Sequence, residues 1–547
     1  MTQRDGNNAM GSTTAAGSVW QPLGIRIFRT LWLAQLVSNI STWMQTVGAQ
    51  WLVTQETQSA SMVALVQTAA SLPILLLGIL AGALADIFNR RRLLLVSQFA
   101  MFAASGVLAV LTALGHMNSY GVLILTFALG CGNALMTPAW QAIQPDLVPR
   151  DQISSAASLN GVNMNLSRAV GPAIGGLVVA LAGSAAAFAV NALSFLVTAA
   201  ALLTWRHCPE PDPLGAERIL PALRAGHRYV RHAPRVRRVL TRALLFVPAG
   251  TALWALLPVV ANRRLGLGAS GYGLLLGAFG AGAVAGAVVL PRIRSHWSSN
   301  TALTGGGVLF ALAMTALALT RNPWIAAAVL TLAGMSWVSV LSTLNAQMQV
   351  TTSGWVRARA LAVYLTLFSG SMAIGAAVWG ALAERAGLMG TLLVAAALMA
   401  IGSIYAWRYL AIPDTPLDRS ASVHWPAPTM LLEPSKADGP VLVTIEYHVP
   451  ADRAEDFVEA MKDFGLSRLR TGALHWDLYQ NGADPDVYLE TFVVASWEEH
   501  LRQHSARLTG SDRALEERAR SLVDPTEPFQ IAHYLPAQLR DRKKARP

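Results

Sequence analysis

The stretch from Gly82 to Arg92, GALADIFNRRR, joins two long apolar segments of the chain. The first segment covers residues 61–84 and the second covers residues 93–115. Each is longer than the ~20 mostly apolar residues that an α-helix needs to cross a bilayer. A short turn with several arginines is typical of the cytoplasmic side of a membrane protein. The stretch therefore predicts two membrane helices joined by a cytoplasmic loop.

The same apolar pattern repeats along most of the chain. Twelve segments are long enough to span a bilayer, at residues 30–54, 61–84, 93–115, 120–141, 157–182, 185–205, 240–262, 271–291, 302–320, 323–343, 361–383 and 388–411. The gap between the sixth and seventh is long and the other gaps are short. We therefore predict an all-α membrane protein with twelve transmembrane helices in two six-helix halves, residues 28–205 and 240–412.

Composition excludes an ordinary soluble enzyme, because 53% of the residues are hydrophobic and only 13% are charged, against about 25% charged in soluble domains. The net charge of +11 is unevenly spread: residues 1–412 hold 26 of the 42 basic residues but only 9 of the 31 acidic ones. With the N-terminus in the cytoplasm, sixteen loop arginines fall inside and four outside. The excess charge thus predicts orientation in an inner (plasma) membrane and contact with its lipid, with both termini cytoplasmic and no nucleic-acid partner.

Residues 1–27 are polar, and we expect no cleaved signal peptide there. The linker, residues 206–239, carries Leu220, Leu223, His227 and Val230 at helical spacing with arginines between them. This pattern predicts a basic amphipathic helix, either lying on the membrane surface or simply joining the halves. Cys131 and Cys208 lack neighbours at metal-ligand spacing, so we expect two free thiols.

After Pro413 the composition becomes that of a soluble protein. Residues 413–440 are rich in proline and polar residues and predict a linker, and residues 536–547 form a basic tail. Between them, residues 441–535 predict strands at 441–449, 474–480, 487–495 and 529–534, and helices at 451–471 and 497–523, the second broken near Gly510. The order β-α-β-β-α-β predicts a C-terminal α+β ferredoxin-like soluble domain.

Residues 82–92 resemble the loop signature of the major facilitator superfamily at Gly82, Asp86, Arg90 and Arg91, and depart from it at Ile87 and Asn89. The resemblance implies a conformational gate at the cytoplasmic end, in which arginines pair with acids of a neighbouring loop. Asp146 is the expected acidic partner. The alternative is a plain positively charged loop. The full set of predicted gate residues is Gly82, Asp86, Arg90, Arg91, Asp146, Arg150, Arg357 and Arg359.

A second motif lies in the fifth segment, at Arg168, Gly171, Pro172, Gly175 and Gly176. It resembles the glycine–proline motif of superfamily exporters and implies efflux; the alternative is ordinary packing of a glycine-rich helix. Residues 138–150, Asn160 and the loop 355–359 resemble the transmembrane secretion effector branch, which includes enterobactin-exporter-like proteins.

Residues 441–535 resemble the antibiotic-biosynthesis-monooxygenase-like dimeric α/β-barrel domains, at Gly472, Trp476, Tyr479, Trp497 and either His500 or His504. Some relatives of that kind are oxygenases and others only dimerise, so the domain is either an enzyme that acts on the transported compound or a module for homodimerisation or regulation. His500 and His504 have i, i+4 spacing, which can bind a metal, but without a third ligand we predict no metal and no cofactor.

Polar residues inside the apolar segments are the candidates for lining a substrate cavity or for bonding between helices. The candidates are Asn39, Gln45, Asn133, Asn163, Trp254, Trp337 and Asn345. No acidic residue lies in the middle of a segment, so the proton coupling that the resemblance implies lacks an evident carboxylate; Glu56 or Glu384 at the outer mouth, or Asp86 and Asp146 in the gate, are the alternatives, as is uniport. The chain has no P-loop pattern.

The sequence therefore predicts a secondary active transporter that exports a small organic molecule, a siderophore, drug or secondary metabolite, by proton-coupled antiport.

Overall fold

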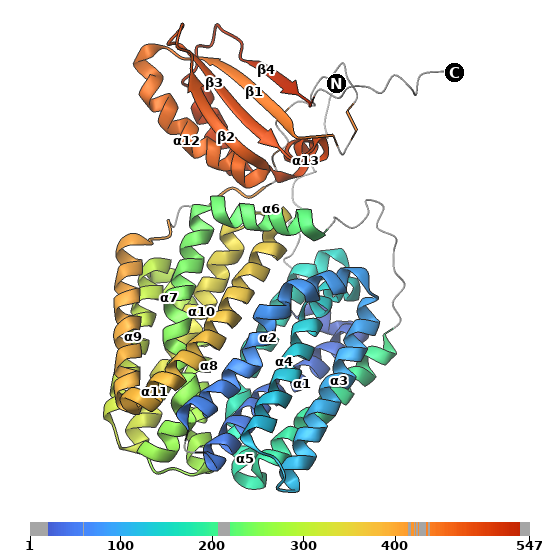
Figure 1. Ribbon diagram of the computed structural model, residues 1–547, viewed down its shortest axis with the longest axis vertical. Coiled ribbons are helices and arrows are strands. Elements are labelled where there is room, and N and C mark those ends of the chain that lie inside the picture. The colour runs from blue at the N-terminus through green and yellow to red at the C-terminus, as the bar shows by residue number, and fades with distance from the viewer. Residues whose placement is uncertain are drawn as a thin grey trace, which may run out of the picture.

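The computed structural model describes residues 20–57, 59–205, 219–413, 417–420, 422, 425, 434–435 and 438–536. The predictions for the N-terminal nineteen residues, for Cys208 with residues 206–218, for most of the second linker and for residues 537–547 lie outside this part. Figure 1 shows a bundle of long helices with a smaller domain of strands and helices at one end. We call residues 441–536 the tail, the end of the bundle beside it the tail-side end, and the opposite end the far end.

The first half of the bundle consists of five long helices with two short 3₁₀ turns between the fourth and fifth. These elements are α1 (Arg26–Glu56), α2 (Ala60–Ile87), α3 (Arg90–Ala113), α4 (Ser119–Ile143), η2 (Gln144–Leu147), η3 (Arg150–Gln152) and α5 (Ile153–Thr204), preceded by η1 (Gln21–Gly24). The side chains of Ser59, Asn89 and Asn118 accept hydrogen bonds from backbone N–H groups in the first turns of α2, α3 and α4. These caps satisfy donors that a helix otherwise leaves unpaired.

The second half follows the linker helix α6 (Ile219–His232). Its elements are α7 (Pro234–Val259), the π-helical turn η4 (Val260–Arg264), α8 (Ala269–His296), α9 (Ser299–Leu319), α10 (Pro323–Thr351), η5 (Gly354–Val356) and α11 (Arg357–Tyr409). Ser298 and Asn322 cap α9 and α10 in the same way.

Two predicted breaks between spans fall at kinks rather than loops. We expected separate helices at 157–182 and 185–205, and at 361–383 and 388–411, and α5 and α11 each consist of two helical segments that meet at a kink. The kinks lie at Gly183, with φ of 78°, and Gly387, with φ of 74°. Glycine adopts positive φ without the steric cost that a Cβ imposes, which allows each chain to turn sharply without a loop. Each long helix therefore contains two helical segments of membrane-spanning length.

Nine helices in the described part of the chain are long and apolar enough to cross a membrane, and α5 and α11 are two of them. The 31-residue α1 is not among the nine, because glutamine, serine, threonine and asparagine interrupt its apolar sequence. Its buried residues nevertheless include Gln35, Gln45 and Gln50. Its polarity therefore reflects contacts with other helices rather than exposure to water.

The linker helix α6 lies between the bundle and the tail (Figure 1). Tyr229 is fully buried, and a methyl group on Gly226 would lie 3.0 Å from the Cβ of Arg359. The tail helix α12 (Ala454–Thr471) packs against its other side. The predicted helix is present, and its contact with α12 of the tail was part of neither sequence alternative.

The tail contains a four-stranded antiparallel sheet in the order β2-β3-β1-β4. The strands are β1 (Val441–His448), β2 (Ala473–Gln480), β3 (Val487–Val494) and β4 (Gln530–Tyr534), and the helices are α12, α13 (Trp497–Arg502), η7 (Gln503–Arg507) and α14 (Gly510–Arg520), with η6 (Ala451–Arg453) before α12. The element order is the predicted one. The long second helix is broken at Leu508 and Thr509, next to the predicted position, because the π-helical turn η7 ends at Arg507 and α14 begins at Gly510.

Buried and partly exposed residues alternate along β1, so that one face of the sheet packs against the core of the tail. Val441, Val443, Ile445 and Tyr447 pack against Phe457, Met461 and Phe464 of α12. One ion pair lies inside this core: Arg468 Nε is 2.8 Å from Glu490 Oε1, and both side chains are almost completely buried. Tyr447 and Trp476 donate further hydrogen bonds to Glu490, at 2.9 Å each. Three side chains therefore donate to this buried carboxylate, which offsets the cost of removing it from water.

Candidate functional site: the boundary between the helical halves

Two of the predicted gate residues, Arg90 and Asp146, meet at the tail-side end of the first half. Arg90 Nη1 lies 3.7 Å from Asp146 Oδ2 and 3.3 Å from the carbonyl oxygen of Ala142. Arg91 instead donates to the carbonyl oxygens of Leu202 and Leu203 at 3.0 and 2.8 Å. The arginines therefore tie the start of α3 to two different helix ends, those of α4 and α5.

The other gate candidates have diverse surroundings. A methyl group on Gly82 would meet no atom within 4 Å, so no close approach requires glycine there. Arg357 is exposed, Arg359 contacts α6, and the side chains of Asp86 and Arg150 lie outside the described part. Asn89, which departs from the superfamily pattern, caps α3 by accepting a hydrogen bond from Arg92 N at 3.1 Å. The departure is thus compatible with the loop geometry.

The glycines of the second motif are contact points of α5. A methyl group on Gly171 would lie 2.6 Å from Trp43 Cβ, and one on Gly175 would lie 2.7 Å from Met44 Cα, both on α1. A methyl group on Gly176 would lie 2.2 Å from Gly273 Cα, on α8 of the other half. Two of these glycines therefore allow α1 and α5 to pack closely, and the third allows backbone contact between the halves. Pro172 lies within α5.

Three cavity candidates bond between helices of the first half. Asn39 Nδ2 donates to Asn163 Oδ1 at 2.9 Å, and Asn163 Nδ2 donates to the carbonyl oxygen of Trp32 at 3.0 Å. Gln45 accepts hydrogen bonds from Asn191 and, at 3.3 Å, from Ser105. These amide side chains form hydrogen bonds that join α1 to α3 and α5, which is the bonding role between helices that was the alternative to lining a cavity.

The two tryptophan candidates belong to an aromatic cluster. Trp254 and Trp337 are 7% and 2% exposed, and their ring centroids lie 6.0 Å apart. Trp254 also contacts Phe279 and Trp43, the latter in the other half. Asn133 and Asn345 are half-buried. The cluster therefore packs α7, α8 and α10 together and reaches α1.

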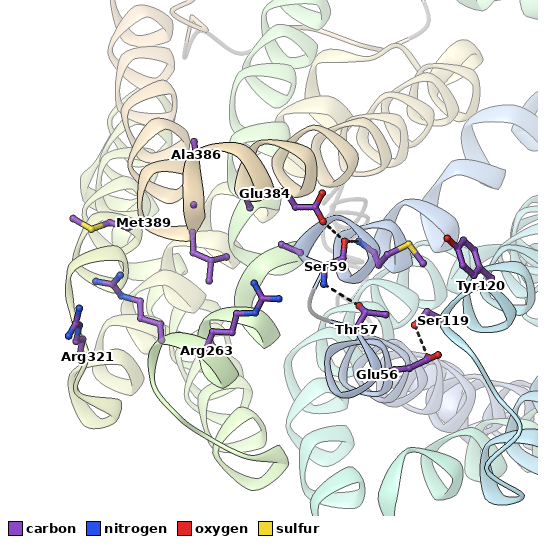
Figure 2. A pocket seen from close by; sticks show the side chains of 16 residues that line it. Glu56, Thr57, Ser59, Ser119, Tyr120, Arg263, Arg321, Glu384, Ala386 and Met389 are labelled. Carbon is purple, nitrogen blue, oxygen red and sulfur yellow. Dashed lines mark hydrogen bonds between the residues drawn. The ribbon is translucent and has the colours of Figure 1, made fainter.

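A cavity of about 1260 Å³ opens at the far end, where the two halves meet (Figure 2). Its lining includes Glu56 and Ser119 of the first half and Arg263, Arg321 and Glu384 of the second. Ser119 Oγ donates to Glu56 at 2.7 Å, and Ser59 Oγ donates to Glu384. Ser61 N donates to the same Glu384 oxygen at 3.3 Å, so this bond bridges the halves.

Further contacts close the boundary between the halves near this cavity. Tyr272 donates to Gln50 at 3.1 Å and stacks on Trp51, with ring centroids 5.5 Å apart. Thr68 Oγ1 donates to the carbonyl oxygen of Ala373 at 2.9 Å. Tyr272 was not among the candidates predicted from the sequence, because a tyrosine within a membrane segment is a weak signal that also occurs in ordinary helix packing.

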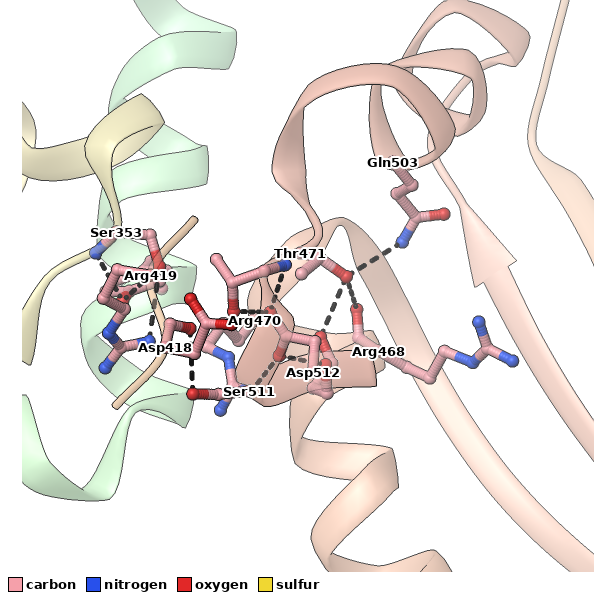
Figure 3. A network of polar contacts seen from close by, with 12 residues as sticks. Ser353, Asp418, Arg419, Arg468, Arg470, Thr471, Gln503, Ser511 and Asp512 are labelled. Atoms are coloured by element: carbon pink, nitrogen blue, oxygen red, sulfur yellow. Dashed lines mark hydrogen bonds and ion pairs between the residues drawn. The ribbon is translucent and has the colours of Figure 1, made fainter. Parts of the chain in front are cut away.

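Arg419, in the linker before the tail, and Arg507 of the tail both contact the bundle around the turn before α11. Arg419 donates to the carbonyl oxygen of Thr351 and to Ser353 Oγ, and Tyr229 of α6 lies 3.1 Å from Ser353 Oγ. Arg507 lies over the ring of Trp355 at 4.8 Å. Figure 3 shows Arg419 beside Ser353 at the edge of a polar network that continues into the tail.

Two carboxylates organise the tail side of this contact. Glu499 accepts two hydrogen bonds from Arg507 and lies 3.7 Å from Arg228 of α6. Burial raises the pKa of Glu499, but Arg507 and Arg228 outweigh it and hold the pKa below its ordinary value. Asp512 binds Arg470, Ser467 and Thr509, and its pKa is lowered in the same way against the opposing effect of burial. Both groups are therefore anionic anchors.

The structure supplies a third histidine to the predicted pair. His500 Nε2 lies 3.2 Å from His504 Nε2 and 3.0 Å from His533 Nε2. Burial, and then the neighbouring His504 and His533, lower the pKa of His500 to about 3. Among the residues with described placement, no group of three or more histidine, cysteine, aspartate or glutamate residues is arranged to hold a metal ion. His533 follows the pair by about thirty residues, so spacing did not reveal it.

Comparison with known proteins places the chain in a family. Residues 17–541 match the family model described as transmembrane secretion effector. The chain is 27% identical over 258 residues to the staphyloferrin A transporter of Staphylococcus aureus, a match that covers 47% of this chain and 65% of that protein, slightly under two thirds. It is 25% identical over 373 residues to the multidrug efflux pump Tap of Mycolicibacterium fortuitum, covering 66% of this chain and 90% of that protein.

The fold resembles solved transporter structures. A bacterial homologue of the human lysosomal transporter Spinster superposes with a TM-score of 0.59 at 16% identity, covering 70% of this chain and 96% of that one. The nucleoside transporter NupG superposes with a TM-score of 0.56 at 11% identity, covering 70% of this chain and 99% of that one. At these identities the likeness concerns the fold alone. The chain is a multi-pass membrane protein that belongs to the transmembrane secretion effector family of the major facilitator superfamily.

Proposed function

We propose that the chain is a secondary active transporter that exports a small organic molecule, of the siderophore, drug or secondary-metabolite type, by alternating access. The contact of Gly176 with Gly273 carries the proposal, because backbone packing between the halves is the kind of surface on which two rigid bodies can close and part. The name of the multidrug efflux pump Tap supports an outward direction, and the name of the staphyloferrin A transporter supports a small organic cargo.

The twelve helical segments, counted with α5 and α11 as two each, form the two halves that rock against each other in this proposal. The distribution of loop arginines supports a cytoplasmic tail-side end, which leaves the cavity of Figure 2 on the outer surface of an inner (plasma) membrane. In this orientation both termini are cytoplasmic.

The pairing of Arg90 with Asp146 serves as a latch at the cytoplasmic end in this proposal. The two side chains are 39% and 33% exposed, so the pair adds no more than about 1 kcal/mol to folding stability. Arg90→Ala should therefore reach the membrane in normal amount and lose export. The matched control is Arg92→Ala, which removes an exposed arginine of the same helix turn. Equal export by the two variants would remove the latch from the proposal.

Proton antiport is the proposed source of energy. Glu56 and Glu384 line the outer cavity from opposite halves, and each accepts a hydrogen bond from a serine that a change in packing between the helices can break. These carboxylates are the proposed proton sites.

The test is export itself. Cells with and without the protein are compared by untargeted mass spectrometry of the medium, with and without a protonophore. The proposal expects compounds that appear only with the protein and disappear when the proton gradient collapses. Export that continues in the presence of the protonophore would be compatible with the proposed transporter but would contradict proton coupling.

A regulatory role for the tail is the second proposal. The docking of Arg419 and Arg507 around Thr351 and Trp355 favours it, because this turn leads directly into Arg357 and Arg359 of the gate set. Arg419→Ala should change the export rate while leaving the set of exported compounds unchanged. A changed set would support an enzymatic tail that modifies the cargo, and an unchanged rate would leave homodimerisation as the role to be tested by light scattering.

A further inference from the structure

Arg168 places a positive charge in the middle of a membrane helix. It lies midway between Ile153, where α5 begins, and the kink at Gly183. Its side chain is half-buried, and its guanidinium carbon lies 5.9 Å from the ring centroid of Phe368 on α11. Because α5 and α11 belong to different halves, the side chain points across the boundary along which the halves move.

Among the residues that the structure describes, this charge has no acidic partner. The sequence has no aspartate or glutamate between residues 152 and 209 or between 218 and 383. Within the described part of the chain, the guanidinium makes a cation–π contact with Phe368 and forms no ion pair. Charged groups inside a membrane are costly, so they are usually paired or functional.

Arg242 of α7 shows how a structural arginine is satisfied in the same bundle. Its guanidinium donates to the carbonyl oxygens of Leu410 and Ala406 and to Asn300 Oδ1, at 2.9 to 3.0 Å. These bonds join helix ends and use its donors. Among the described residues, Arg168 has no comparable set of acceptors, which separates it from a purely structural arginine.

A second polar group beside Arg168 is also unsatisfied. Tyr364 lies one helical turn before Phe368, is 2% exposed, and its hydroxyl finds no hydrogen-bond partner among the described residues. Its ring centroid lies 6.5 Å from that of Phe368, the ring that the Arg168 guanidinium contacts. A buried hydroxyl without a partner is unusual in a native protein and indicates an absent acceptor.

The outer end of the same boundary has a positive excess. Arg263, Arg264 and Arg321 line the cavity of Figure 2 together with two carboxylates, Glu56 and Glu384, which already accept hydrogen bonds from serines. A positively charged exit would attract an anion that leaves a central site.

We propose that Arg168 and Tyr364 form the substrate-binding site for an anionic group, a carboxylate or a comparable oxyanion, of the exported molecule. The guanidinium of Arg168 donates charge-assisted hydrogen bonds to the oxyanion, the hydroxyl of Tyr364 donates one more, and the ring of Phe368 covers an apolar or aromatic part of the substrate. Since the two donors come from different halves, the bound anion joins the halves, and its release frees them to move. This proposal rests on the proposed export function.

The experiment compares the medium of cells that express the full chain as wild type, Arg168→Gln, Arg168→Lys, Tyr364→Phe or Arg408→Gln. Arg408 is the control, because it is an exposed α11 arginine with its own aromatic contact at the tail-side end. Membrane levels of each variant are measured by quantitative blotting, and compounds that depend on the wild type are sorted by net charge at pH 7.

The expected compounds are anions. Their export should fall about tenfold or more in Arg168→Gln and about threefold in Tyr364→Phe, as expected for loss of a charged and a neutral hydrogen bond. Export should stay near wild type in Arg408→Gln and recover partly in Arg168→Lys, which keeps the charge and shows that the site still folds.

Two outcomes overturn the proposal while leaving export intact. One is a set of wild-type-dependent compounds that are neutral or cationic. The other is undiminished export of anions by Arg168→Gln at equal membrane level. A medium that contains no protein-dependent compound overturns the export function itself, and with it this site.

Discussion

Three histidines of the tail meet at the imidazole of His500, which is 1% exposed. Its folded pKa of about 3 lies far below the ordinary 6.5. Below pH 6.5 His500 binds a proton in the unfolded chain but stays neutral in the folded tail. The stability that His500 contributes is therefore present above that pH and is lost as the pH falls toward 3.

The tail should therefore lose about 1.4 kcal/mol of unfolding free energy between pH 7.5 and pH 5.5. Pulse proteolysis of the purified full chain in urea, scored by cleavage within residues 441–536, measures this difference. His500→Gln should show a smaller pH dependence than the wild type, and His533, whose pKa burial also lowers, accounts for a remaining slope of the same sign. A wild-type tail equally stable at the two pH values would contradict the assignment of a neutral, buried His500.

The buried pair of Arg468 and Glu490 gives a second prediction for single residues. Glu490→Gln leaves the guanidinium, sandwiched between Trp425, Phe464 and Phe492, without its anion. Loss of one partner of a buried pair costs about 3–5 kcal/mol. The same proteolysis assay measures it, with Arg513→Gln as control, since the Arg513–Glu517 pair is more than half exposed and should change stability by less than about 0.5 kcal/mol.

At the scale of elements, the contact of α5 with α8 depends on two facing glycines. Gly176→Val would place side-chain atoms within van der Waals distance of the Gly273 backbone and force the two helices apart. The expected result is a protein that inserts normally and loses most export. Gly161→Val is the matched control in the same helix, because a methyl group there meets no atom within 4 Å.

Full export by Gly176→Val would show that this contact is dispensable.

At the scale of the whole molecule, the tail, α6 and the turn at 351–356 form one contact region. Arg419→Ala removes the bonds to Thr351 and Ser353 and should raise amide hydrogen exchange in residues 351–356 several-fold, because the turn loses part of its cover. Arg453→Ala, at an exposed position in the tail, is the control and should leave that exchange unchanged. If residues 351–356 stay protected from exchange in Arg419→Ala, the contacts of Tyr229 and Arg507 must hold this turn instead.

Much of the architecture was predictable from the chain, since local composition decides it. Apolar length marks membrane helices because each must satisfy its own backbone hydrogen bonds in lipid. Strand alternation in residues 441–449 and the order of elements up to Tyr534 predicted the antiparallel tail. The span lengths predicted breaks near residues 183 and 387, but not that each break is a kink at a single glycine, because a glycine at such a place is compatible with a kink or with a loop.

The candidate site divides in the same way. The sequence by itself determined which groups are available: an arginine without acidic neighbours at position 168, amides in α1, and a loop with arginines at 90–92. Only the tertiary structure decided how they are used, since Asn39 and Gln45 bond to other helices while Arg168 faces Phe368 and Tyr364 across the halves. The physical reason is the distance along the chain over which each property is decided. Whether a segment enters the bilayer depends on residues close in sequence, whereas the pairing of polar groups depends on helices that come together from distant parts of the chain.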